Sequence, residues 1–353
     1  MDWGRPPATV HILLSTKRLS ALVAHEYHDL TATAQAGARI ADVNRELARH
    51  GQWLPIESPF EETTIGGAIA TNDSGPLRHR YGTPRDVLIG IRLALTDGRV
   101  IKAGGNVVKN VAGYDLGKLM SGSHGSLAAI ASATFKLTPL PGASSTLVAR
   151  FDDAGSMLKA LEGINGSQLE SSTCEIRAGI RDPGSGIREV QLLLKFESTP
   201  GALSAHVQRA RGLVGSATCD VVASEAEAAL WHEHARALWD APGAIVRAAW
   251  LPASLGGVLA FIDKAGAEIE LAGRAAIGAG LLRIGDHAAT QRRVIDSMRR
   301  GDLFRHVVVL RASSELKQTI DVWGELGDAG RLGASVKRML DPNGILNAGR
   351  GPV

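Results

Sequence analysis

Residues 62–90 read "ETTIGGAIATNDSGPLRHRYGTPRDVLIG", and the first half of this stretch consists mainly of small residues and short polar side chains. Gly66 and Gly67 let the backbone approach a ligand without an intervening Cβ. Successive backbone N–H groups can form an anion-binding nest, and a helix N-terminus adds its dipole. Asn72 and Ser74 place hydrogen-bonding side chains beside that backbone. The same pattern suits a structural turn before a buried helix, so no single glycine decides between the two interpretations.

Residues 104–130, "GGNVVKNVAGYDLGKLMSGSHGSLAAI", form a second glycine-rich stretch, which runs into an apolar tail typical of a strand. Lys109 and Asp115 lie inside it and could form an ion pair or contact a cofactor. Two such stretches in one chain favour a phosphate-rich cofactor over two unrelated turns.

Two common nucleotide motifs are excluded. Residues 113–119, "GYDLGKL", lack both the spacing and the final hydroxyl of a P-loop. Residues 278–285, "GAGLLRIG", start like a dinucleotide-binding fingerprint but have Arg283 where the third glycine belongs. The cofactor must therefore be held by a different kind of loop.

Metal and nucleophile motifs are missing as well. His232 and His234 are two residues apart, so on a helix they point in widely different directions and cannot chelate together. H-E-x-x-H is absent, and "GSHGS" at residues 122–126 has histidine where a hydrolase elbow needs serine. No metal site is predicted.

Composition narrows the class of protein further. The chain has 353 residues, of which 44% are hydrophobic and 21% charged, so we expect an ordinary globular protein with two domains. The net charge is only +3, and the most basic stretch, "RRVIDSMRR" at residues 292–300, suits a solvated helix face, so no nucleic-acid partner is expected.

Cys174 and Cys219 fit neither a disulfide framework nor a metal site. Without a signal peptide or an apolar span of about 20 residues, we expect a soluble, cytoplasmic protein, leaving open a peripheral place at the inner membrane through partners.

Periodicity predicts the local elements. We expect strands at residues 10–14 and 30–36, a helix through Ile40, Val43 and Leu47, and a hairpin around Asp97–Gly98. After residue 141, strands such as "EVQLLLKF" and "AIVRAAWL" alternate with helices such as "DAGSMLKALEG" and "EAEAALWHEHARALW". This alternation predicts a separate α+β domain, with its helices on one face of a sheet.

Three sets of strings carry a resemblance to a known family. They are "TIGGAIATNDSG" with "RYGTPRDVLIGIRLALTDGRVIKAGG", then "VVKNVAGYDLGKLMSGSHGSLAAIASATFKLTPLP", and the terminal "LDPNGILNAGR". On these strings the chain resembles the FAD-linked oxidase family with the vanillyl-alcohol-oxidase, or PCMH-type, flavin fold, and within it the FAD-binding subunits of bacterial glycolate oxidase (glycolate dehydrogenase). The likeness covers residues 2–141 and 331–350 well, and the middle only loosely.

The resemblance implies an α+β fold in three parts. These are a PCMH-type FAD-binding domain at residues 1–141, an α+β cap domain at 142–324, and a C-terminal segment at 325–353 that returns to the FAD domain. Members of the family begin with a strand, a Pro-x-Gly-x-Gly diphosphate loop and a second strand, whereas this sequence begins at a position that follows the loop. We therefore expect an incomplete first subdomain, through a late start codon or a truncation.

The resemblance also implies the residues that bind FAD. Those near the pyrophosphate and ribityl chain would be Thr64, Ile65, Gly67, Ala70, Thr71, Asn72 and Gly75. Those offering backbone atoms to the adenine side would be Ser123, Gly125, Ala129 and Ile130, and Asn347 would lie near the flavin ring.

The implied function is that of an FAD-binding subunit that supports electron transfer while glycolate or a similar small 2-hydroxy acid is oxidised. The implied partners are a homologous catalytic flavin subunit and an iron–sulfur subunit. The histidine motifs of catalytic relatives are missing from "GAGLLRIGDH" and "WGELGDAGRLG", so the catalytic residues are unknown, with only His287 and Arg283 as candidates. A non-catalytic scaffold subunit with a degenerate flavin site is the alternative.

Overall fold

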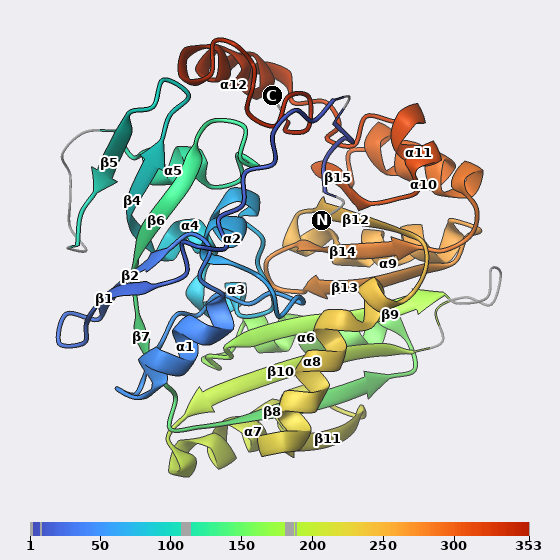
Figure 1. The fold of residues 1–353 in the computed structure, drawn as a ribbon. Helices are drawn as coiled ribbons and strands as arrows, with labels where there is room; N and C mark the ends of the chain where they lie inside the picture. The colour runs from blue at the N-terminus through green and yellow to red at the C-terminus, as the bar shows by residue number, and fades with distance from the viewer. Residues whose placement is uncertain (1–2, 8, 107–113, 181–186, 188, 353) are drawn as a thin grey trace. The chain divides into compact units, whose positions relative to one another are not determined.

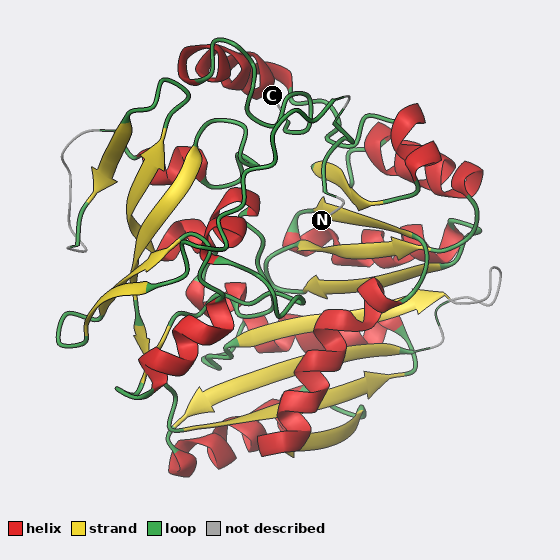
Figure 2. Cartoon of the chain, viewed as in Figure 1, coloured by secondary structure: helices red, strands yellow, loops and turns green. Residues whose placement is uncertain are grey.

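The computed structural model describes residues 3–7, 9–106, 114–180, 187 and 189–352. Helices and strands are mixed along the whole chain (Figure 2). The chain divides into two compact units. Unit 1 comprises Met1–Trp3 and Pro141–Gly324, and unit 2 comprises Gly4–Leu140 and Glu325–Val353. The C-terminal segment thus belongs to the same unit as the first part of the chain.

Unit 2 is built on a five-stranded antiparallel sheet with the order β1-β2-β6-β4-β5 (Figure 1). The sheet strands are β1 (Leu22–Glu26), β2 (Thr31–Gln35), β4 (Leu88–Ala94), β5 (Val100–Gly104) and β6 (Ala129–Lys136). A two-stranded ribbon is formed by β3 (Gln52–Trp53) and β7 (Thr138–Pro139). The helices are α1 (Ile40–Ala48), α2 (Ile65–Thr71), α3 (Arg78–Tyr81), α4 (Pro84–Val87), α5 (Leu116–Met120) and α12 (Gly327–Leu340).

Several predicted elements of unit 2 are confirmed. The strand expected at residues 30–36 is β2, and the helix expected through Ile40, Val43 and Leu47 is α1, which buries all three side chains. The hairpin around Asp97–Gly98 joins β4 to β5, with Gly98 at φ +85° as a tight turn requires.

The strand predicted at residues 10–14 is wrong. These residues form no regular element, and Ile12 and Leu13 are 85% and 88% exposed. The reason is that a strand needs a neighbour for its N–H and C=O groups, and the sheet begins at β1, with no strand paired beyond it among the described residues. Favourable local propensity cannot replace that partner.

Unit 1 is built on an eight-stranded antiparallel sheet with the order β11-β8-β10-β9-β13-β14-β12-β15. Its strands are β8 (Ala143–Phe151), β9 (Thr173–Ile180), β10 (Val190–Ser198), β11 (Thr218–Ala223), β12 (Ala244–Ala249), β13 (Ile269–Arg274), β14 (Ala279–Ile284) and β15 (His306–Arg311). Its helices are α6 (Ala154–Asn165), α7 (Pro200–Leu213), α8 (Ser224–Asp240), the short 3-10 helix η1 (Pro252–Ser254), α9 (Leu255–Lys264), α10 (Ala288–Arg300) and α11 (Ser314–Thr319).

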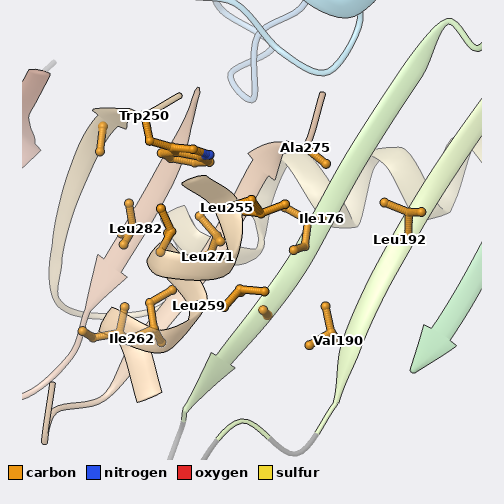
Figure 3. Packing of buried hydrophobic residues seen from close by; sticks show 14 of the residues in the cluster. Ile176, Val190, Leu192, Trp250, Leu255, Leu259, Ile262, Leu271, Ala275 and Leu282 are labelled. Carbon is orange, nitrogen blue, oxygen red and sulfur yellow. The ribbon is translucent and has the colours of Figure 1, made fainter. Parts of the chain in front are cut away.

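The core of unit 1 lies between one face of this sheet and the helices α6, α7, α9 and α10. Figure 3 shows part of it, where Leu255 and Leu259 of α9 lie against Ile176 and Leu271 of the sheet. Leu192 and Leu194 of β10 face the same core, because alternate residues of a strand share a face.

The prediction that all helices cover one face is wrong for α8. Leu238 of α8 packs with Ile245 and Leu310 in a cluster separate from the main core. Figure 1 shows α8 on the opposite side of the sheet from α6 and α9. Trp3 joins this smaller cluster and stacks on Trp239, with ring centroids 6.1 Å apart. The second face carries many charged side chains, and α8 covers part of it.

Candidate functional site

Three segments of unit 2 meet where α2 ends. Asn72 adopts the left-handed conformation and terminates the helix. The N–H groups of Gly122 and His124 donate to the carbonyls of Ile69 and Ala70, at 3.0 and 2.8 Å. The last carbonyls of the helix are thereby satisfied by the loop at residues 122–125. We call this meeting point, formed by Asn72, residues 122–125 and Asn347, the loop junction.

The C-terminal segment completes the loop junction. The Asn347 side-chain amide donates to the His124 carbonyl at 2.7 Å. Lys337 of α12 donates through Nζ to the carbonyls of Ser126 and Leu346, at 2.7 and 2.9 Å, and forms an ion pair with Asp341. The tail is therefore attached to the loop by the side-chain amide of Asn347 and by the partly buried side chain of Lys337.

Left-handed backbone is concentrated at the loop junction. Asn72, His124 and Asn347 have φ of 46°, 52° and 45°, values that side-chain-bearing residues rarely adopt. Gly125 has φ +70°, and a Cβ there would lie 2.9 Å from the Nδ2 atom of Asn347. Strained backbone that the surrounding structure holds in place is typical of ligand-binding loops.

Ser123 has an unsatisfied hydroxyl in this loop. The residue is only 7% exposed, and its Oγ has no hydrogen-bond partner within the described part of the chain. Leaving a buried hydroxyl unpaired costs about 1–3 kcal/mol. Because neighbouring Ser121 and Ser126 donate to the carbonyls of Gly117 and Ser123, the missing partner distinguishes Ser123.

The anion-binding nest predicted at the start of α2 is wrong. The N–H groups of Ile65 and Gly66 donate to the carbonyls of Ala38 and Ala36, at 2.9 and 2.7 Å, and Gly67 donates to the Thr64 side chain at 3.2 Å. Since these donors are already used, they do not point at a ligand. Gly66 instead permits close packing, because a Cβ there would lie 2.9 Å from the Cβ of Ala36.

The structure therefore separates the predicted cofactor residues into groups. Ala70, Asn72, Ser123, Gly125 and Asn347 lie together at the loop junction. Thr64, Ile65 and Gly67 lie at the other end of α2, about 10 Å away for a helix of seven residues. The other four predicted residues are Thr71, Gly75, Ala129 and Ile130.

Thr71 donates through Oγ1 to the carbonyl of Gly67 at 2.9 Å, so its hydroxyl is used inside the helix. Gly75 packs on Glu57, whose carboxylate accepts from the Leu77 amide at 2.7 Å. Ala129 and Ile130 begin β6 and pair with β4.

The expected pair of Lys109 with Asp115 cannot be assessed, because Lys109 lies outside the described residues. Asp115 itself caps α5 by accepting from the Lys118 amide at 3.0 Å, and its carboxylate pairs with Lys118 Nζ at 3.0 Å. Both side chains are more than half exposed, so this pair is worth at most about 1 kcal/mol.

Lys337 and Asp341 were not among the predicted site residues. Their i, i+4 spacing on a helix was a signal in the sequence. This spacing is typical of an exposed ion pair between Lys337 and Asp341, whereas the structure buries the Asp341 side chain completely. Burial would by itself raise the pKa of Asp341, but hydrogen bonds from Lys337 and from the amides of Leu346 and Ile345 outweigh it and hold the pKa below its usual range.

Arg283, a candidate for binding a substrate carboxylate, is already neutralised. Its guanidinium pairs with Glu268 and, at 2.7 Å, with Glu270, and it donates to the Pro242 carbonyl at 2.8 Å. The side chain is buried. His287, the other candidate, is the residue before the first turn of α10. The structure gives Arg283 a structural role.

His234 of α8 forms the centre of a buried polar cluster on the second face of unit 1. Arg177 Nε donates to His234 Nδ1 at 2.7 Å, so Nδ1 is unprotonated and the proton lies on Nε2, 3.1 Å from Glu175. Arg274 approaches the other oxygen of Glu175 at 3.6 Å. His234 is therefore a neutral structural histidine between α8 and the sheet.

This cluster predicts a loss of stability in mild acid. Burial is the main reason that the pKa of His234 lies below 6.5, and the charges of Arg177 and Arg274 add to it, although Glu175 acts in the opposite direction. Because the unfolded chain binds a proton as pH falls through 6.5 and the folded chain does not, stability should fall by up to about 1.4 kcal/mol per pH unit below that value. Urea unfolding at pH 7.5 and 5.5 should show a smaller difference for His234→Gln than for the natural chain.

Residues 4–104, which supply much of unit 2, match the family described as the FAD binding domain. This part of the chain is therefore an FAD binding domain of that family. FAD is the indicated cofactor, and the partnerless Ser123 hydroxyl beside left-handed backbone fits a ligand at the loop junction.

Curated relatives resemble only part of the chain. It is 32% identical over 173 residues to "Glycolate oxidase subunit GlcD" of Bacillus subtilis, covering 49% of this chain and 37% of the relative. It is 39% identical over 128 residues to "Glycolate oxidase subunit GlcE" of Escherichia coli, covering 36% of this chain and 37% of the relative. A mitochondrial "D-lactate dehydrogenase [cytochrome]" of Arabidopsis thaliana is 31% identical over 234 residues, which are 63% of this chain and 41% of the relative. The chain thus spans well under half the length of these relatives.

A solved structure described as alkyldihydroxyacetonephosphate synthase superposes with a TM-score of 0.68 at 16% identity, covering 97% of this chain and 68% of the other. At this identity the match concerns the fold alone. The predicted fold class, a PCMH-type FAD-binding domain with a second α+β domain and a returning C-terminal segment, is confirmed.

No metal centre or membrane span appears in the part of the chain that the structure describes. No group of three or more histidine, cysteine or acidic side chains there could hold a metal ion. No described helix combines the length and apolar character needed to cross a bilayer.

Proposed function

We propose that this chain is the FAD-binding subunit of a complex that oxidises glycolate or a similar 2-hydroxy acid. The observation that carries the proposal is the buried Ser123 hydroxyl, which has no hydrogen-bond partner among the described residues and lies in a loop held by α2 and by the C-terminal segment. The match of residues 4–104 to the FAD binding domain supports FAD as the group that supplies this partner. Relatives named for glycolate and D-lactate support the class of substrate.

FAD, when bound, supplies a two-electron acceptor for an alcohol carbon. The chain's own residues bind and orient it. Ser123 donates a hydrogen bond, the backbone of Asn72 and Gly125 approaches closely because it is left-handed, and Asn347 fixes the loop through the His124 carbonyl. Thr64, Ile65, Gly67, Ala70, Thr71, Gly75, Ala129 and Ile130 belong to the same proposal as neighbours of the cofactor.

The partners in this proposal are a homologous catalytic flavin subunit and an iron–sulfur subunit that receives the electrons. The names of two relatives, both subunits of glycolate oxidase, support a complex of several chains. One observation favours the alternative of a scaffold with a degenerate flavin site: the amides at the start of α2, expected to hold a phosphate, are used inside the protein.

Titration of the purified chain with FAD separates the two functions. We expect the visible flavin spectrum to remain with the protein at one FAD per chain after gel filtration. A chain that stays colourless in excess FAD would support the scaffold. Activity with glycolate is then measured on the assembled complex, because the chain matches only part of its relatives.

A substitution at Ser123 sharpens this test. Ser123→Ala should weaken FAD binding about tenfold, since a buried hydrogen bond to the ligand is lost. The same change should leave the stability of the FAD-free protein unchanged or slightly higher, because it removes an unpaired buried hydroxyl. Ser121→Ala is the matched control, since the Ser121 hydroxyl already donates to Gly117 at 2.9 Å and should not affect FAD binding. Equal FAD affinity in Ser123→Ala and the natural chain would contradict the assigned contact.

A further inference from the structure

The side of α9 that faces away from the sheet carries very small residues. Leu255, Leu259 and Ile262 point to the sheet and are buried (Figure 3). Residues on the other side of the helix must therefore face away from the sheet, because side chains follow a period of 3.6 residues. Those residues are Gly257 and Ala260, both exposed, followed one turn later by Lys264. Two nearly absent side chains leave a depression along the helix.

A groove of about 360 Å³ lies between α9 and α10 at this depression. Phe261 and the buried side of Val294 form its apolar floor, and Ser297 and Arg293 line the α10 side. The ring of Phe261 packs edge-to-face against the ring of Phe304, with the ring centroids 5.3 Å apart. The volume lies at the lower end of the range for ligand pockets, so it suits one or two large apolar side chains.

The rim of the groove is positively charged. Arg293 donates to the carbonyls of Ala265 and Gly266, at 3.0 and 3.3 Å, which fixes its guanidinium at the end of α9. Lys264 lines the same groove. Among the described residues, no carboxylate forms an ion pair with either cation, and no acidic residue lines the groove. The nearby Asp296 lies 3.7 Å from Arg292, and Asp263 accepts from the Ile187 amide.

We propose that this groove docks an acidic, amphipathic segment of a partner protein. The apolar floor would take a leucine-like side chain, and carboxylates on either side of it would meet Lys264 and Arg293. The stretch "RRVIDSMRR" adds to this field, because α10 carries Arg292, Arg293, Arg299 and Arg300 against one acid, Asp296. A second copy meeting the groove through its own α10 would oppose like charges, so charge complementarity points to an acidic partner. The proposal does not rest on the bound flavin.

The test uses the full chain and a labelled synthetic helical peptide with leucines on one face flanked by glutamates. A peptide with lysine in place of every glutamate is the matched probe. Fluorescence anisotropy should show that the acidic peptide binds at least tenfold more tightly and that added salt weakens it. Ala260→Trp should fill the groove and abolish binding, and Lys264→Glu should weaken it at least fivefold. Lys136→Glu, the same charge change on an exposed residue of unit 2, should have no effect.

Several results would overturn the proposal. Equal binding of the acidic and basic peptides would contradict it, and so would the absence of acidic-peptide binding up to about 1 mM. Binding that persists in a folded Ala260→Trp chain would place the peptide elsewhere. Circular dichroism spectra that match the natural chain confirm that each variant is folded. Concentration-dependent self-association abolished by Ala260→Trp, or binding of anionic vesicles in preference to the peptide, would assign the groove to a different occupant.

Discussion

Replacing Lys337 by methionine is expected to lower the free energy of unfolding of unit 2 by about 3–5 kcal/mol. The substitution leaves Asp341 buried without its cation, and the carbonyls of Ser126 and Leu346 lose their donor. Methionine keeps the length of the side chain, so the effect measures charge and hydrogen bonds more than packing. Hydrogen exchange followed by mass spectrometry should show faster exchange in residues 325–353 and in the loop at residues 122–126.

Arg338→Met provides the matched control on the same helix. Arg338 is exposed and, within the described part of the chain, donates only to the Ser335 hydroxyl, so the change should alter stability by no more than about 0.5 kcal/mol. If Lys337→Met and Arg338→Met unfold at the same denaturant concentration, Lys337 does not attach the tail.

The second large effect is expected at Glu175 of unit 1. Glu175→Leu should destabilise the unit by about 3–5 kcal/mol, because the buried Nε2–H of His234 loses its acceptor and the ion pair of Glu175 with Arg274 is removed. Tryptophan fluorescence during urea unfolding is a suitable measurement, since of the six tryptophans only Trp53 lies in unit 2.

Glu233→Leu is the control for that experiment. Its carboxylate pairs with Arg177 at 3.3 Å but is 71% exposed, so its loss should cost at most about 1 kcal/mol. Similar destabilisation by Glu175→Leu and Glu233→Leu would show that the buried cluster does not hold α8 on the sheet.

Local patterns predicted the elements whose causes lie within a few residues. The period of Ile40, Val43 and Leu47 predicted α1, and the Asp97–Gly98 turn predicted the β4–β5 hairpin. The alternation after residue 141 predicted an α+β unit, because buried and exposed positions already differ along each strand. It could not predict that α8 covers the second face, since the partners of Leu238 come from β12 and β15.

The sequence by itself determined the class of cofactor, because two glycine-rich stretches and the terminal "DPNGILN" string are written in consecutive residues. Only the tertiary structure decided what surrounds each glycine. Gly66 serves close packing, whereas Gly125 lies beside Asn347 and the partnerless Ser123. The contact between Lys337 and Ser126 joins residues 211 positions apart, and such a contact has no local signature, because burial and hydrogen-bond partners exist only once the chain has folded.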